Sequence, residues 1–524
     1  MELHGKNIIA GETSGAGTRT FSAVNPATGA ELAPAFHEAT DAEVNRAVEF
    51  AAAAWGDYRH RAPEQIAAFL ETCGAEIMAL GDELIQRAHA ETALPETRLL
   101  AERVRTVNQF NLFAQLVREG SWVDARIEHG MPGRKPGPKP DLRRMLQPLG
   151  PIAVFGASNF PFAYSVAGGD TASALAAGNP VLAKAHPAHP GACELAMRAL
   201  HAAVRKCGLP AGLISMLHGN SNAVGLALVR HPLVKAVGFT GSVQGGLALC
   251  DAAAKRAEPI PVYAEMGSTN PIFVLPGALA ARSTEIAQGL AQSVTLGVGQ
   301  FCTNPGLVFG VAGPQFQQFC AQVGDLVKRV APGTMLTAAM CARYRQGCEE
   351  FRGIPGVQLA AAASGAEPGQ AAAALFSTDA DTFLQTPALH EELFGPSTLL
   401  IACPTPAALC ATAGRLRGQL TATVHGTPED LRENAGLLDV LLQKAGRLIC
   451  NGFPTGVEVC AAMQHGGPYP ATSHAHFTSV GTAAVLRFAR PVCYQDFPQE
   501  LLPPALRDRN ERGIWRLVDG QLTK

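Results

Sequence analysis

A cysteine, a glutamate and an asparagine lie in three short segments whose residue types could together support covalent catalysis. Cys302 lies in GQFCTNPG (299–306), Glu265 in AEMGSTNP (264–271) and Asn159 in FGASNFPF (155–162). A thiol can attack a carbonyl carbon, a carboxylate can activate water, and a side-chain amide can donate a hydrogen bond to an oxygen that gains negative charge. Together these groups would suit acyl-transfer chemistry.

Each residue also has a plainer interpretation when it is taken alone. The chain has 13 cysteines, and free cysteine is among the most buried residue types, so an inert thiol is the commoner role. Asn159 would often cap a helix or a turn, and Glu265 would often be a carboxylate at a strand end. In the functional interpretation, desolvation raises the pKa of Glu265, which suits a general base, and nearby backbone N–H groups lower the pKa of Cys302, which suits a nucleophile.

The segments that carry these residues belong to a series of alternating strands and helices. Short apolar runs, bounded by glycine or proline, are followed by longer alanine-rich stretches, which predicts an α/β protein with two parallel-sheet lobes. Strands are expected at 151–156, 180–185 and 236–241 and then at 270–275, 307–312, 397–402, 422–426 and 448–452, with helices over 161–177, 190–206 and 243–254.

The remaining parts of the chain are read from their composition. Helical stretches over 42–59 and 64–92 precede a segment around 130–140 whose glycines and prolines predict a loop or an extended arm. Residues 364–376 resemble an exposed loop, and the tail 490–507 looks too rich in proline for a regular element.

The bulk composition indicates a large globular protein with a small-molecule partner. The 524 residues suggest two or three domains, and a net charge of −2 gives little attraction for nucleic acid or an anionic membrane. No apolar run is long enough for a membrane span, and the amino terminus lacks the pattern of a secretion signal, so we expect a cytoplasmic protein. The scattered cysteines predict neither a disulfide framework nor a metal site.

One turn in the first lobe is a candidate phosphate site. The fingerprint GxGxxG is missing, but VGFTGSVQGG (237–246) ends a strand and opens a helix at Gly241 and Ser242. The free N–H groups of that helix start could face a phosphate. The alternative is that Ser242 only caps the helix.

Considered as an ordered set, FGASNFPF, VLAKAHPAHP, VGFTGS, AEMGSTNP, GQFCTNPG and EELFGP closely resemble the aldehyde dehydrogenase superfamily over nearly the whole chain. The segments from FGASNFPF to VLAKAHPAHP, and NGFPTGVEVCAAMQHGGPYPATS (451–473), look most like its 2-oxoglutarate semialdehyde (2,5-dioxopentanoate) dehydrogenase branch, which also contains an NADP-linked fatty-aldehyde enzyme. The resemblance implies two Rossmann-like parallel-sheet domains plus a small oligomerisation arm. The cofactor-binding domain would comprise 1–125 and 151–267, the catalytic domain 268–480, and the arm and C-terminal segment 126–150 and 481–524.

The resemblance also implies roles for the three reactive residues. Cys302 would be the nucleophile that forms a thiohemiacetal and then a thioester. Asn159 and the backbone N–H of Cys302 would hold the oxyanion, and Glu265 would activate the water that hydrolyses the thioester. No metal would be needed, and the protein would be a homodimer, with a tetramer as the alternative.

For the dinucleotide, the resemblance implies a second set of residues. Lys184 would reach the adenosine ribose, Gly241 and Ser242 would meet the pyrophosphate, and Glu392 with Phe394 would position the nicotinamide ribose and ring.

Two departures from the family pattern concern specificity. Pro187 occupies a position where NAD-preferring relatives carry a glutamate, so we expect NADP to be accepted and preferred over NAD. Ser158 stands where many relatives carry an aromatic residue; what this does to the substrate tunnel is left open.

A substrate that carries a carboxylate needs a cation near the tunnel, and Arg105 on the helix 96–110 is the candidate. The alternative is an ordinary charged helix, in which Glu102 pairs with Arg98 or Arg105.

These observations favour an NAD(P)-dependent oxidation of 2-oxoglutarate semialdehyde to 2-oxoglutarate. Medium-chain or fatty aldehydes, oxidised with NADP, are the alternative substrates. Two other classes stay open at this stage, namely a cysteine-dependent hydrolase, which Cys302 and Glu265 alone could support, and a non-catalytic relative.

Overall fold

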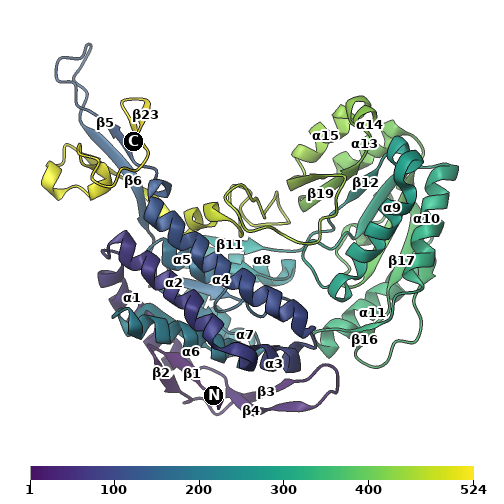
Figure 1. Cartoon of the computed structure of the whole chain (residues 1–524), viewed down its shortest axis with the longest axis horizontal. Helices are drawn as coiled ribbons and strands as arrows, with labels where there is room; N and C mark the ends of the chain where they lie inside the picture. The colour runs from purple at the N-terminus through teal and green to yellow at the C-terminus, as the bar shows by residue number, and fades with distance from the viewer. Residues whose placement is uncertain (1) are drawn as a thin grey trace.

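The computed structural model describes residues 2–524, which form two lobes and a projecting arm (Figure 1). Each lobe is built on a seven-stranded sheet, and the arm on a five-stranded sheet. The N-terminus lies at the base of the first lobe, and the C-terminus lies in the arm (Figure 1). In the described residues no helix combines the length and apolar character that crossing a membrane requires.

The first lobe has the strand order β11-β10-β7-β8-β9-β1-β2. Its five parallel strands are β7 (Ile152–Phe155), β8 (Val181–Lys184), β9 (Ile214–Leu217), β10 (Ala236–Thr240) and β11 (Val262–Glu265), and β1 (Asn7–Ile9) and β2 (Glu12–Ser14) are antiparallel. Successive residues face opposite sides of a strand, so Val154 and Ala153 of β7 belong to two separate buried clusters. Both faces of this sheet are therefore covered. A separate hairpin pairs β3 (Thr20–Val24) with β4 (Glu31–His37).

Helices of the first lobe divide between these two faces. Residues of α2 (Pro63–Ala79), α3 (Gly81–Thr92), α4 (Glu96–Glu119), α5 (Gly169–Ala176) and α6 (Pro190–Lys206) pack in one cluster, and residues of α1 (Asp41–Tyr58), α7 (Asn222–Arg230) and α8 (Val243–Ala254) pack in the other. The helix expected over 64–92 is two helices, which Leu80 separates.

The helix expected over 161–177 is wrong in its first half. Residues 161–168 form turns, and α5 begins only at Gly169. The carboxylate of Glu102 accepts hydrogen bonds from the backbone N–H groups of Phe162 (2.8 Å) and Ala163 (3.0 Å). These N–H groups are satisfied by a side chain from another helix, so the segment does not need helical bonds.

The second lobe has the strand order β15-β17-β18-β13-β12-β19-β20, and only β15 runs antiparallel to its neighbour. The strands are β12 (Ile272–Val274), β13 (Leu307–Val311), β15 (Gln358–Ala362), β17 (Ala374–Asp379), β18 (Ser397–Cys403), β19 (Gln419–His425) and β20 (Ala445–Cys450). Its helices are α9 (Pro276–Thr295), α10 (Pro314–Val327), α11 (Ala338–Gly353), α12 (Ala380–Gln385), α13 (Pro406–Arg415), α14 (Pro428–Glu433) and α15 (Ala435–Leu442). A two-stranded sheet pairs β14 (Gly333–Thr334) with β16 (Gln370–Ala371).

The prediction of an exposed loop over 364–376 is wrong at its carboxyl end. Ala374–Asp379 form β17, which lies inside the sheet between β15 and β18. Leu375 and Phe376 are fully buried there. The alanine-rich sequence before them gave no local sign of a strand, because its partners lie elsewhere in the chain.

The arm sheet joins two distant parts of the chain in the order β21-β6-β5-β22-β23. Its strands are β5 (Arg126–Glu128), β6 (Leu142–Pro148), β21 (Ala489–Gln495), β22 (Arg516–Val518) and β23 (Gln521–Thr523). The expectation that the tail 490–507 has no regular element is therefore wrong at its start. Pro491 is tolerated because β21 is an edge strand, where a missing N–H can face away from the sheet.

Candidate active site

The parallel strands of the first lobe bring four of the candidate residues to one edge of the sheet. Glu265 ends β11 opposite Thr240 of β10, and Lys184 ends β8 opposite Phe155 of β7. Asn159 follows β7 and Ser242 follows β10, so both lie beyond the same carboxyl ends. Ligands of open parallel sheets bind at this edge.

Cys302 comes from the second lobe, in a tight turn between α9 and β13. Gly297, Val298 and Gly299 have positive φ angles of 56°, 59° and 65°. A β-branched residue is strained in this conformation. A Cβ at position 299 would lie 2.2 Å from the backbone of Gly395, so this close approach requires glycine. The turn therefore fixes where the cysteine projects.

The loop that carries Cys302 is also anchored by Asn270, which sequence analysis did not single out. Its Nδ2 donates to the carbonyl oxygens of Cys302 (2.8 Å) and Asn304 (2.9 Å). Asn270 itself has a φ of 45° and is fully buried. Because Asn270 lies five residues after Glu265, this contact ties the two reactive segments together.

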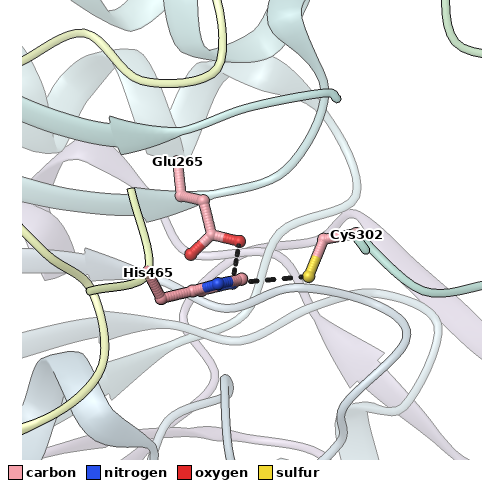
Figure 2. A group of neighbouring side chains, drawn as sticks. All are labelled: Glu265, Cys302 and His465. Atoms are coloured by element: carbon pink, nitrogen blue, oxygen red, sulfur yellow. Dashed lines mark hydrogen bonds and ion pairs between the residues drawn. The ribbon is translucent and has the colours of Figure 1, made fainter. Parts of the chain in front are cut away.

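A histidine that sequence analysis missed completes the site. His465 Nε2 lies 2.9 Å from Glu265 Oε1 and 3.5 Å from Cys302 Sγ, so the three side chains converge (Figure 2). The segment that carries His465 runs beside the end of β11, where Met266 N–H donates to the carbonyl of Ala471. His465 is 1% exposed and Glu265 3%, so water is largely excluded around both.

The electrostatics of these residues differ from the sequence-based expectation. Burial by itself raises the pKa of Glu265, but the electrostatic interaction and hydrogen bond with His465 and the hydrogen bond from the Ser479 hydroxyl outweigh it, so the pKa of this carboxyl is lowered. Burial and the neighbouring Glu265 raise the pKa of Cys302 well above its usual value. Both expected directions are therefore wrong, and the resting site pairs a protonated thiol with an ionised carboxylate.

Asn159 lies beside the cysteine turn. Its side chain is buried, and Nδ2 donates to the carbonyl of Gln300 at 3.0 Å. Its own carbonyl accepts from Arg98 Nη2 at 2.7 Å. The amide carries a second N–H, so it retains a donor for an oxygen bound close to Cys302.

An aromatic cluster flanked by arginines lies next to the candidate catalytic residues. Phe160, Tyr164 and Phe301 belong to one buried cluster. The Arg105 guanidinium carbon lies 5.6 Å from the centre of the Phe160 ring and 5.3 Å from that of Tyr164. Arg98 lies 5.1 Å from the centre of the Phe160 ring and 4.7 Å from that of Phe301. Arg105 and Arg98 are half-buried, and their guanidinium groups lie over aromatic rings. Charged side chains on a solvent-facing helix would not have these contacts.

The alternative of an ordinary charged helix does not describe α4. Glu102 is buried, and its hydrogen bonds go to the backbone of residues 162 and 163. In residues 2–524 it forms no ion pair within 4 Å of Arg98 or Arg105, although their charges act on it from further away. Arg105 Nη2 donates to the Tyr164 hydroxyl at 3.2 Å, and its buried Nε has no partner in the same residues. The guanidinium therefore keeps a free donor.

One arginine near this cluster was missed by sequence analysis. Arg447 of β20 donates to the carbonyls of Pro454 and Gly456, and its electrostatic interactions reach Cys302 and Tyr164. Arg447 directly precedes the apolar run that predicted the strand 448–452, so no local signal marked it as a site residue.

The expected cofactor residues in the first lobe differ in exposure, since Gly241 and Ser242 are exposed and Lys184 is half-buried. Ser242 Oγ accepts from Gly245 N–H at 3.2 Å and caps α8, and both Gly241 and Ser242 are exposed. Lys184 is half-buried, and no hydrogen-bond or ion-pair partner of its amine is found in residues 2–524. Burial lowers its pKa to about 8. An unpartnered amine and a free helix start fit a ribose and a pyrophosphate.

Glu392 and Phe394 belong to the second lobe, where they lie in the loop before β18. They line a pocket together with Ser268, Thr269 and Asn304. Glu392 Oε2 packs over Gly267, where a Cβ would lie only 2.5 Å away. The loop therefore faces the segment that follows Glu265.

A thiol, a side-chain amide and a carboxylate that meet between two α/β lobes are the groups that catalysis through a covalent acyl intermediate requires. The chain belongs to the aldehyde dehydrogenase family, whose model matches residues 13–468. The family oxidises aldehydes with NAD(P), so the predicted fold and enzyme class are confirmed. The hydrolase and non-catalytic alternatives are thereby disfavoured.

Two curated relatives match over the full chain. The alpha-ketoglutaric semialdehyde dehydrogenase 2 of Azospirillum brasilense is 50% identical, over 99% of this chain and 100% of its own. The alpha-ketoglutaric semialdehyde dehydrogenase of Acinetobacter baylyi (strain ATCC 33305 / BD413 / ADP1) is 44% identical, over 100% and 99%. These are the enzymes of the branch that the sequence motifs resembled.

Solved structures share the fold at low identity. A 1-pyrroline-5-carboxylate dehydrogenase mutant from Thermus thermophilus superposes with a TM-score of 0.79 at 20% identity, covering 94% of this chain and 92% of that chain. A betaine aldehyde dehydrogenase mutant from Staphylococcus aureus, in complex with NAD+, gives 0.80 at 17% identity and covers 94% and 97%.

Proposed function

We propose that the protein oxidises 2-oxoglutarate semialdehyde to 2-oxoglutarate with NADP or NAD. The observation that carries this proposal is the position of Arg105, whose partly free guanidinium lies on the aromatic cluster beside Cys302, Glu265 and His465. The names of both full-length relatives support the same substrate.

Cys302 Sγ attacks the aldehyde carbon, and the thiol proton moves to Glu265, the carboxylate that contacts this side chain. The oxygen that becomes negative is held by Asn159 Nδ2 and the Cys302 backbone N–H. Bound NAD(P) would supply the hydride acceptor that oxidation of the thiohemiacetal requires. After Glu265 has released its proton to solvent, it takes one from water, whose oxygen attacks the thioester carbon. The C–S bond then breaks, the carboxylic acid product leaves, and the Cys302 sulfur takes the proton back from Glu265 to restore the thiol.

His465 acts as a positioning residue in this scheme. Its Nε2–H donates to Glu265 Oε1, while Ser479 donates to Oε2. Two donors orient the carboxylate and keep it ionised between the thiol and the water that it must activate.

Arg105 is the residue that we assign to the substrate carboxylate. A five-carbon substrate with an aldehyde at one end and an oxo-acid at the other needs an apolar wall and a terminal cation. Phe160 and Tyr164 supply the wall, and the free donors of Arg105 supply a charge-assisted hydrogen bond.

For the cofactor, we propose that Lys184 binds the adenosine ribose, Gly241 and Ser242 the pyrophosphate, and Glu392 with Phe394 the nicotinamide ribose and ring. NADP preference is supported by Pro187, which places no carboxylate at the position typical of NAD enzymes. Glu38 interacts electrostatically with Lys184 but is bonded to Ser221 N–H and paired with Arg19. It is therefore already neutralised in part.

We further propose a homodimer, or alternatively a tetramer, assembled through the arm formed by 126–150 and 481–524. Large apolar side chains are exposed in this region, including Leu501 (67%) and Leu522 (68%). The functional domains would be 1–125 with 151–267 for the cofactor and 268–480 for catalysis. Thirteen unpaired cysteines favour the reducing cytoplasm.

A steady-state panel tests the substrate and the cofactor together. The panel pairs 2-oxoglutarate semialdehyde, succinate semialdehyde and hexanal with NADP and NAD, and formation of the reduced cofactor is followed by absorbance. We expect the largest kcat/KM for 2-oxoglutarate semialdehyde with NADP. A larger value for hexanal would favour the medium-chain alternative, and a strong preference for NAD would contradict the cofactor proposal.

A further inference from the structure

We propose that Cys302, His465 and Glu265 form a binding site for a thiophilic divalent cation, best suited to Zn²⁺, and that the bound ion holds the enzyme in an inactive state. The three residues offer one sulfur, one nitrogen and one oxygen ligand, all within 4.8 Å of one another. Aldehyde oxidation uses the same side chains without a metal, so the proposal adds a second, inhibitory use of the site.

The distances between the ligand atoms support a tetrahedral zinc site. With Zn–S of about 2.3 Å and Zn–N and Zn–O of about 2.0–2.1 Å, neighbouring ligand atoms lie about 3.3–3.6 Å apart. Cys302 Sγ and His465 Nε2 are 3.5 Å apart, so this edge already fits. His465 Nε2 and Glu265 Oε1 are 2.9 Å apart, and a small rotation of the glutamate side chain opens that edge by about 0.4 Å.

The arrangement of partners leaves the required ligand atoms available. Ser479 donates to Glu265 Oε2, so Oε1 remains free to bind an ion once the His465 proton has moved. His465 Nδ1 is buried without a hydrogen-bond partner in residues 2–524, so it can carry that proton but gains no bond by doing so. Because histidine ligands usually donate their second N–H to an acceptor, this missing hydrogen bond predicts a moderate affinity for the ion.

Charge also favours a dication at this position. A thiolate and a carboxylate side by side repel each other, and the low exposure of His465 and Glu265 reduces screening by water. On binding, Cys302 loses its thiol proton to solvent, the His465 proton shifts from Nε2 to Nδ1, and the ion gives up three waters. No group is oxidised, so a chelator should reverse the reaction.

Three protein ligands leave a fourth position open for water, as in catalytic zinc sites. With its sulfur bound to the ion, Cys302 cannot attack an aldehyde, and Glu265 cannot activate water. The ligands lie 163 and 200 residues from His465 along the chain, which is why no ligand spacing marks this site in the sequence.

The test uses the full-length enzyme without dinucleotide and Co²⁺ as a spectroscopic probe for the zinc site. We expect one equivalent of Co²⁺ to produce a sulfur-to-cobalt charge-transfer band that Zn²⁺ abolishes. Cys302→Ser should remove the band, and His465→Gln and Glu265→Gln should each weaken binding at least about tenfold. The control variant Cys450→Ser/Cys493→Ser, which changes the two exposed cysteines, should keep it.

Activity is then measured in zinc buffers. We expect Zn²⁺ to inhibit the wild-type enzyme, a chelator to restore activity, and prior addition of the aldehyde to slow inhibition. A band that persists in Cys302→Ser, or Co²⁺ affinity unchanged by His465→Gln, would overturn the proposal. Because the absorbance band does not depend on turnover, these results are independent of the proposed substrate, and thermal melts of each variant show whether it is folded.

Discussion

Replacing Arg105 by methionine should change selectivity between charged and uncharged aldehydes. Methionine keeps much of the apolar contact with Phe160 and Tyr164 but removes the guanidinium. In the structure Arg105 has one hydrogen bond of 3.2 Å, to Tyr164, and a buried Nε without a partner in the described residues. A substrate carboxylate would therefore satisfy a donor that is unsatisfied at rest.

The size of the effect follows from that missing bond. A hydrogen bond to a charged group contributes about 1.5–3 kcal/mol, and about 1.4 kcal/mol corresponds to a factor of ten. Arg105→Met should thus lower kcat/KM for 2-oxoglutarate semialdehyde about 10- to 150-fold, mainly through KM. For hexanal, which has no carboxylate, the change should stay within about threefold.

The assay is steady-state kinetics on both aldehydes with saturating cofactor. Arg103→Met is the matched control, because Arg103 lies on the same helix but donates to the carbonyl of Gly81. It should not change the ratio of the two kcat/KM values. If Arg105→Met reduces activity toward both aldehydes by the same factor, Arg105 does not bind the carboxylate and its role is structural.

Three further predictions concern other parts of the site. Asn159→Ala should lower kcat about 10²- to 10³-fold, because it removes an oxyanion donor; an unchanged kcat in steady-state assays would contradict this role. Burial lowers the pKa of Lys184 to about 8, so its ammonium loses its proton as the pH rises through that value. KM for NADP should then rise more than KM for NAD. If Lys184→Met shows the same pH-dependent difference between the two cofactors, another group causes it. Gly299→Ala should reduce the free energy of unfolding by at least about 1 kcal/mol, since the new Cβ would overlap Gly395 at a φ of 65°; a thermal melt that matches the wild type would show that the turn relaxes.

Three parallel strands of the first lobe, β7, β8 and β10, could be predicted closely from the sequence, for a physical reason, whereas no strand was predicted at β9 or β11. A buried parallel strand is a short apolar run that must end where the chain turns, so the run 151–156 and its flanking glycine placed β7 (Ile152–Phe155) to within a residue. Elements that depend on distant partners were missed. Residues 161–168 have the composition of a helix, but Glu102, about 60 residues earlier, binds their N–H groups.

The candidate site shows the same division between local and distant information. The motifs around Asn159, Glu265 and Cys302 led to the residues, but not to their electrostatics. Burial and Glu265 raise the pKa of Cys302, and the pKa of Glu265 is lowered by His465, which is 163 positions beyond Cys302. His465 stands in MQHGG, within a segment used only for the family resemblance, and no local pattern distinguished this histidine from the others in the chain.

The geometry of Cys302, His465 and Glu265 also explains why a hydrolase was a reasonable alternative from sequence. Aldehyde oxidation through a thioester ends with hydrolysis of an acyl-cysteine, and that half of the reaction needs the groups that a cysteine hydrolase needs. What distinguishes the two classes lies outside these residues. Lys184 and the start of α8 at Ser242 place an unpartnered, half-buried amine and exposed backbone donors at the same sheet edge, and an enzyme that only hydrolysed esters would have no use for them.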